Sequence, residues 1–327
     1  MTDMKIHWRD IDDRLEPGRW DRLHVTVEEA HAPTFAVSVC PPDRLRLSAG
    51  DVPVLWARIE EDYYGYEYLR KGGDASWSIV PPISFQVADE IASQPPEARA
   101  RAWAKRFAAW LSTSAYSPLH AGEWTLSPRM RWHAGALLLP GDLDGIFAHE
   151  SRGYVAWDHI VHPLPLRDVS PSDDGRVKAW RKLARRGELP PILLQWISGL
   201  VAYVVLDGHY RLLAAKLEGK PVPFLCLDRV STMARDDGHR QMVLDAVDKA
   251  FEHSARASHA PGHASRTFTP DKANRILLDA FMPHLISQPT VAGSVRFDPV
   301  RWDAEVRAEA TRQGVDVTEM LDVQASR

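Results

Sequence analysis

The segment around Gly208 constrains the fold most, because an apolar run passes through a glycine turn directly into a helical pattern. Residues 200–206 are apolar and rich in β-branched side chains, which is typical of a central strand. The positions after the turn have the spacing of a helix, with leucines at 212, 213 and 217. The sequence therefore predicts a buried strand, a tight turn at Gly208 and a helix.

The start of this predicted helix is a candidate site for an anion. The first N–H groups of a helix lack internal partners, and the helix dipole favours negative charge beside them. We expect His209 and Arg211 to add positive charge there. The alternative is structural, since Asp-Gly is a common turn and Asp207 would simply cap the helix. Spacing alone leaves both interpretations open.

An ordered unit surrounds the turn. The pattern predicts a strand at 190–196, a turn at 198–199, a second strand at 201–206, the helix to 217, and a third strand at 222–227. Gly219 is placed to end the helix. Such a succession of short elements indicates a compact α/β unit.

Together, this unit and its turn resemble the ParB N-terminal and sulfiredoxin-like superfamily over about residues 159–228. In that resemblance, 164–171 corresponds to the opening strand with its exit loop, and 176–186 to the first helix. The box Asp207-Gly208-His209-Tyr210-Arg211 is similar to an Asp-Gly-His-His-Arg box and departs from it at Tyr210. That branch includes an ADP-dependent free serine kinase.

The other two branches of the superfamily fit less well. A sulfiredoxin has a nucleophilic cysteine at the position where this chain has His209. The only cysteines of this chain are Cys40 and Cys226, so thiolate chemistry at the box is excluded. Partition proteins have a Gly-Glu-Arg-Arg box, of which only Gly208 and Arg211 are present here. The kinase-like branch is therefore favoured.

The resemblance implies a nucleotide site. Its cofactor is ADP or ATP, with CTP as an alternative, held by Gly208, His209, Tyr210 and Arg211. Asp207 and His209 would be catalytic, and Asp207 would also orient Mg²⁺ or the acceptor. Phosphoryl transfer needs aligned oxygens, neutralised phosphate charge and a base for the acceptor hydroxyl. By this resemblance, the box supplies each of these requirements for phosphoryl transfer except the base.

The base would be an acid after the opening strand. The nearest acids are Asp168, Asp173 and Asp174, and the last two are equally well placed to cap the following helix. Our leading hypothesis is a nucleotide-dependent phosphotransferase or nucleotide hydrolase that acts on a small hydroxyl compound or a partner protein. The alternative is a non-enzymatic nucleotide-gated module, similar to a CTP switch, or a DNA-associated regulator.

The rest of the 327 residues predicts an α+β protein with more than one part. We expect an N-terminal α+β domain at 1–155, the ParB/sulfiredoxin-like α/β core at 156–230 and a C-terminal helical region at 231–327. A flexible loop is expected at 253–267, before a helix at 270–284. The closing helix within 298–321 would pack on the core or on a partner subunit, so a homo-oligomer stays open.

Composition excludes several classes of function. A formal net charge of −4 gives no general basic footprint, and no basic helix-turn-helix is found, so nucleic-acid binding is not expected beyond a local patch at 181–186. Two distant cysteines make neither a disulfide framework nor a zinc quartet. No apolar run reaches the length of a membrane span, and the start does not read as a signal peptide. We therefore expect a cytoplasmic protein.

Overall fold

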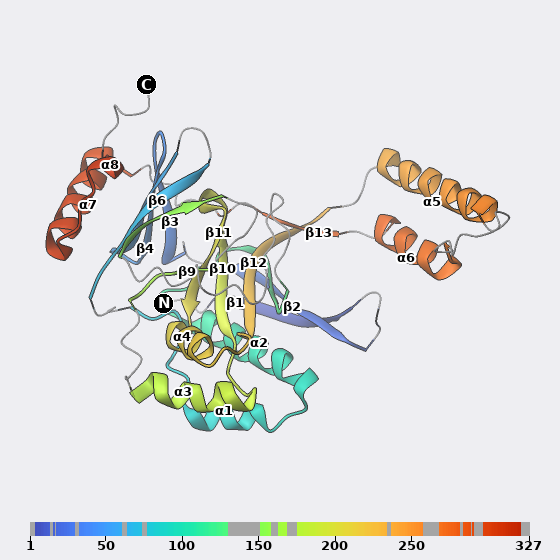
Figure 1. Cartoon of the computed structure of the whole chain (residues 1–327), viewed down its shortest axis with the longest axis horizontal. Helices are drawn as coiled ribbons and strands as arrows, with labels where there is room; N and C mark the ends of the chain where they lie inside the picture. Colours follow the sequence, from blue (N-terminus) through green and yellow to red (C-terminus); the bar gives the residue numbers. More distant parts are fainter. Residues whose placement is uncertain are drawn as a thin grey trace.

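The computed structural model describes residues 4–13, 16, 18–29, 33–60, 64–73, 77–129, 151–157, 163–168, 175–233, 237–257, 268–281, 284–288, 290 and 297–321. These residues form two β-sheets, with helices packed outside them (Figure 1). The predicted α+β class is confirmed. Within the described ranges, every helix is too short or too polar to cross a membrane.

The larger sheet contains the strands that were predicted around Gly208. Its order is β1 (Lys5–Asp12), β2 (Trp20–Glu29), β7 (Gly122–Ser127), β12 (Phe224–Met233), β10 (Ile192–Ile197), β11 (Ala202–Asp207) and β9 (Leu164–Pro165), and β13 (His284–Ser287) also pairs with β12. β10 and β12 are parallel, whereas β10 and β11 form an antiparallel hairpin. The carboxyl ends of β10 and β11 therefore lie at opposite ends of this hairpin.

Helices cover both faces of this sheet. α3 (Gly175–Arg186) and α4 (His209–Leu217) pack together on the face that carries Leu194, Tyr203 and Val205. α2 (Pro96–Thr113) lies against β2 and β7, and α1 (Phe85–Ala92) packs beside it. Because β10 and β11 are buried on both faces, their sequences are nearly continuous apolar runs rather than alternating ones.

The smaller sheet is antiparallel throughout. Its order is β3 (Phe35–Cys40), β4 (Arg44–Ala49), β5 (Val52–Ile59), β6 (Gly65–Arg70) and β8 (Arg152–Ala156). The C-terminal helices α7 (Pro299–Gln313) and α8 (Thr318–Leu321) pack on it through Trp302, Val306 and Met320. The closing helix thus packs on the core of its own chain, one of the two expected arrangements.

A helical arm extends from the larger sheet. α5 (Asp237–Ala257) and α6 (Pro270–Phe281) pack on each other, and Figure 1 shows them away from the sheets, at the ends of β12 and β13. The loop predicted at 253–267 is wrong for residues 253–257, which continue α5; residues 258–267 lie outside the described ranges. The predicted helix at 270–284 stops at Phe281, and β13 follows it.

The predicted domain boundaries at 155 and 230 do not separate folding units. β7, from the first segment, pairs with β12, and α7, from the last, packs on the smaller sheet. Hydrogen bonding between strands that are far apart in the chain leaves no local signal in either strand. The three expected domains are therefore corrected to one interleaved architecture in the described parts.

Trp302 anchors α7 to the smaller sheet. Its side chain is fully buried, and its indole Nε1–H donates to the Leu45 carbonyl at 3.0 Å. We expect Trp302→Ala to lower the free energy of unfolding by about 3–5 kcal/mol, because a large cavity opens and that carbonyl loses its donor. Val300 lies on the same helix with its side chain 75% exposed, so Val300→Ala is the control. Equal urea midpoints for the two variants would contradict this anchoring.

Candidate functional site

Gly208 forms the turn that the sequence predicts. It joins β11 to α4 with φ +102° and ψ +19°, and it supplies no side chain to cap the helix. A Cβ atom at this position would lie 2.7 Å from Ile192 Cγ2 and 2.8 Å from Arg211 Nη2. Glycine is therefore required both by the left-handed backbone and by the side chains packed over it.

Asp207 and Arg211 form an ion pair across this turn. Arg211 Nη2 donates to Asp207 Oδ2 at 2.7 Å and to the Pro191 carbonyl at 3.0 Å. The Arg211 side chain is only 5% exposed, against 24% for Asp207. The carboxylate that was expected to orient Mg²⁺ or to cap the helix is thus already bound to a guanidinium. The part of the chain that the structure describes contains no cluster of three or more histidine, cysteine or acidic residues suited to a metal.

His209 is buried and holds the start of α4 against the strand β9. Its Nε2 accepts the backbone N–H of Leu166 at 3.0 Å, so the neutral ring has its proton on Nδ1. Burial, together with the cations Arg167, Arg70 and Arg211, holds the pKa of His209 well below its ordinary value of 6.5. The expectation that His209 adds positive charge is therefore wrong at neutral pH, because burial and three guanidinium groups disfavour a second proton on the ring.

Two further arginines, which the sequence did not single out, lie beside this histidine. Arg70, at the end of β6, is 2% exposed; it donates to the Pro165 carbonyl at 3.2 Å and pairs with the Asp168 carboxylate. Arg167 donates to the Trp77 carbonyl, and its guanidinium carbon lies 4.2 Å from the centre of the indole ring. Three guanidinium groups, counting Arg211, thus converge near the start of α4.

Each of these arginines keeps one unmet donor. The Nε–H groups of Arg70, Arg167 and Arg211 are buried and have no hydrogen-bond partner among the residues described. Among the residues that the structure locates, two carboxylates pair with these cations, Asp207 and Asp168. The start of α4 therefore carries an excess of positive charge and donors in a partly buried place, which favours an anion.

Of the remaining predicted site residues, some lie within the described ranges and others lie outside them. Asp168 lies after β9 as expected, and its side chain is 47% exposed. Tyr210 is half-buried on α4, and the Arg176 guanidinium carbon lies 5.8 Å from its ring centre. Asp173 and Asp174 fall outside the described residues. Of the three proposed bases, the structure thus locates only Asp168.

No protein-family model matches this chain, and no curated protein or solved structure is significantly similar to it. The likeness to the ParB and sulfiredoxin-like superfamily therefore stays a prediction, based on the box at 207–211 and the order of the elements around it. The chemistry of the site has to be argued from its own side chains.

The space above Gly208 can be tested with two alanine variants. Gly208 and Gly219 both have positive φ, but a Cβ at Gly219 would meet nothing within 4 Å. We expect Gly219→Ala to cost about 1–2 kcal/mol from backbone strain alone. Gly208→Ala should cost about 1–3 kcal/mol more, because Ile192 and Arg211 must move. Equal free energies of unfolding for the two variants, measured in urea, would show that the close packing is unimportant.

The buried neutral His209 predicts a stability that falls in acid. Below pH 6.5 the unfolded chain binds a proton at this residue and the folded chain does not, so the free energy of unfolding decreases as the pH drops from 6.5 toward the lower folded pKa. A single site contributes at most about 1.4 kcal/mol per pH unit. His209→Gln keeps an acceptor for the Leu166 N–H and should remove this slope.

The control for that experiment is His120→Gln, because the pKa of His120 is also lowered, chiefly by burial. Urea unfolding of the parent and both variants between pH 7.5 and 5 separates the two contributions. A parent slope that survives unchanged in His209→Gln would contradict the assignment to His209.

Proposed function

We propose that the protein binds the phosphate groups of a nucleotide at the start of α4. The observation that supports this is the convergence of Arg70, Arg167 and Arg211, each with an unmet Nε–H, on a helix start without a side-chain cap. The nucleotide is ADP or ATP by the resemblance, with CTP as the alternative. A nucleotide-dependent role would place the protein in the cytoplasm.

Guanidinium groups suit this ligand better than other cations would. Their planar donors match phosphate oxygens two at a time, and they keep their charge at any physiological pH. Arg70 and Arg211 are anchored to backbone carbonyls, and Arg167 is stacked on Trp77. Because these groups are already ordered, a phosphate bound there would cost little side-chain entropy.

A nucleotide-gated binding module is the role that this geometry supports best. Arg70 belongs to the smaller sheet, and its carbonyl accepts Gln313 Nε2 of α7 at 2.8 Å. A phosphate that engaged Arg70 would compete with Asp168 for the same guanidinium. Ligand binding at α4 would thereby bias the contact between the larger sheet, the smaller sheet and α7.

Phosphoryl transfer is the second candidate, and Asp168 is the residue that favours it. This carboxylate is half-exposed and fixed by Arg70 beside the cationic site, so it is the general-base candidate for a small hydroxyl acceptor or a partner protein. His209 does not fit that role, since its Nε2 is occupied by the Leu166 N–H. The located residues do not complete a Mg²⁺ ligand set, so no step is assigned to the metal.

Arg167→Ala tests the site. It removes a guanidinium that is less buried than the other two, and the loss of one charge-assisted hydrogen bond, about 1.5–3 kcal/mol, predicts a roughly 10- to 100-fold weaker nucleotide affinity. Arg185→Ala is the control: it removes the same charge from α3, where Arg185 pairs with Glu218 at the far end of α4. Calorimetry with ADP, ATP and CTP, with and without Mg²⁺, measures both.

The outcomes separate the candidates. Binding without release or transfer of phosphate favours the gated module, and turnover that Asp168→Asn abolishes favours the enzyme. Equal affinities in Arg167→Ala and Arg185→Ala, or no nucleotide bound by the parent, would contradict the proposal.

A further inference from the structure

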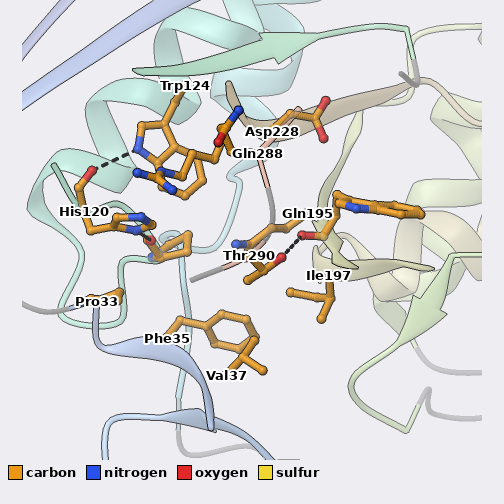
Figure 2. A pocket seen from close by; sticks show the side chains of 13 residues that line it. Pro33, Phe35, Val37, His120, Trp124, Gln195, Ile197, Asp228, Gln288 and Thr290 are labelled. Atoms are coloured by element: carbon orange, nitrogen blue, oxygen red, sulfur yellow. Dashed lines mark hydrogen bonds between the residues drawn. The ribbon is translucent and has the colours of Figure 1, made fainter. Parts of the chain in front are cut away.

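A pocket lies at the end of the β10–β11 hairpin that is opposite the α4 site, between the two sheets (Figure 2). Its volume is about 450 Å³ when the space that is open to solvent is included. Its walls come from β3, β7, β10 and β12, with residues 288 and 290 after β13. It shares no lining residue with the α4 site, so the inference drawn from it is independent of the proposed function.

Gln195 supplies the first unmet polar group of this pocket. Its side chain is 4% exposed, and its Oε1 is buried without a hydrogen-bond partner in the described structure. The neighbouring Thr290 hydroxyl is already used, because it donates to the Trp196 carbonyl at 3.0 Å and accepts the Ser198 N–H at 3.1 Å. A buried unmet acceptor lowers stability, and in a pocket it is open to a donor from a ligand or from a water.

His120 supplies a second acceptor. Its Nδ1 lies 3.4 Å from the Pro118 carbonyl, which places the proton on Nδ1 and leaves a lone pair on Nε2. That Nε2 is buried and has no partner among the residues that are described. Burial and the nearby Arg229 cation lower the pKa of His120, so the ring is neutral at pH 7. It therefore accepts, and does not donate, at Nε2.

Arg229 supplies the cation of this pocket. Its guanidinium lies over Gly122, where an added Cβ would be 3.4 Å from Nε. Its Nε–H is buried and has no partner among the described residues. The pocket also has a carboxylate in its lining, Asp228, which accepts the Tyr203 hydroxyl at 3.2 Å. A half-buried guanidinium of this kind favours an anionic ligand.

The opposite wall of the pocket is apolar. Figure 2 shows Phe35, Val37 and Ile197 on that side, across from His120 and Trp124. The enclosed part of this space is narrow, with room for about one or two water molecules, and the rest opens to solvent. A ligand of a few heavy atoms fits these dimensions, and a nucleotide does not.

We propose that this pocket binds a small organic carboxylate that carries an adjacent hydrogen-bond donor, as a 2-hydroxy acid does. The carboxylate would pair with Arg229, the hydroxyl would donate to Gln195 Oε1 or His120 Nε2, and the short carbon chain would face Phe35 and Val37. One small molecule of this kind would form hydrogen bonds with the unmet Arg229 N–H and with one of the two unmet acceptors, Gln195 Oε1 or His120 Nε2.

Three matched probes test the chemistry. Glycolate has both charge and donor, acetate has the charge alone, and glycolamide has the donor without the charge. We expect the parent to bind glycolate at least tenfold more tightly than either of the others, measured by chemical-shift titration of the full chain. Arg229→Met should weaken glycolate at least tenfold, whereas Arg256→Met, on the 80% exposed Arg256 side chain of α5, should leave it unchanged.

Gln195→Leu separates a ligand site from a structural water site. We expect this variant to lose the preference for glycolate over acetate while its unliganded thermal midpoint rises, because the unmet acceptor is gone. Three results would overturn the proposal: no shift with any probe up to tens of millimolar, the same glycolate affinity in Arg229→Met as in the parent, or a lower unliganded midpoint in Gln195→Leu, as expected for a lost water site.

Discussion

The structure depends on the pairing of one strand, β12, with partners from both halves of the chain. β12 runs parallel to β10 and antiparallel to β7, and its last residues also pair with β13. This pairing joins the strands around the Gly208 turn, β10 and β11, to the N-terminal strands in one continuous sheet. Both sites depend on it, because the sheet fixes the ends of β10, β11 and β12 relative to the second sheet.

Buried arginine is the second constraint on this fold. Four arginines of the smaller sheet and α4 are 5% exposed or less: Arg44, Arg46, Arg70 and Arg211. Arg46 is held by Glu305 at 2.8 Å and Arg44 by Asp303 at 3.0 Å, whereas Arg70 and Arg211 pair with Asp168 and Asp207. A buried cation without a partner is costly, so each of the four has a carboxylate. The two groups differ in place: Arg44 and Arg46 tie α7 to the smaller sheet, and Arg70 and Arg211 lie around His209 at the start of α4.

Local patterns explain which parts of this structure could be predicted. The strand, the Gly208 turn and α4 depend on residues within a few positions of one another, and all three were predicted from spacing. The positions of Arg70 and Arg167 around His209 depend on sheet pairing between distant segments, which has no local signature. The same holds for the pocket between the two sheets, whose polar groups at 120, 195 and 229 come from three separate strands or loops. The neutral state of His209 follows from its burial, which a single sequence does not reveal.

The position of Arg70 determines what a ligand at α4 could change. A ligand shifts an equilibrium only by its difference in affinity for the two states, so a phosphate must gain contacts when Arg70 leaves Asp168. Arg70 also bonds the carbonyl of Pro165, and its own carbonyl accepts from Gln313, so its backbone is fixed while its Nη2 can exchange partners. The exchange would then free the exposed Asp168 carboxylate without unfolding β6. Any signal would therefore begin at the contact between Arg70 of the smaller sheet and Asp168, which follows β9 of the larger sheet.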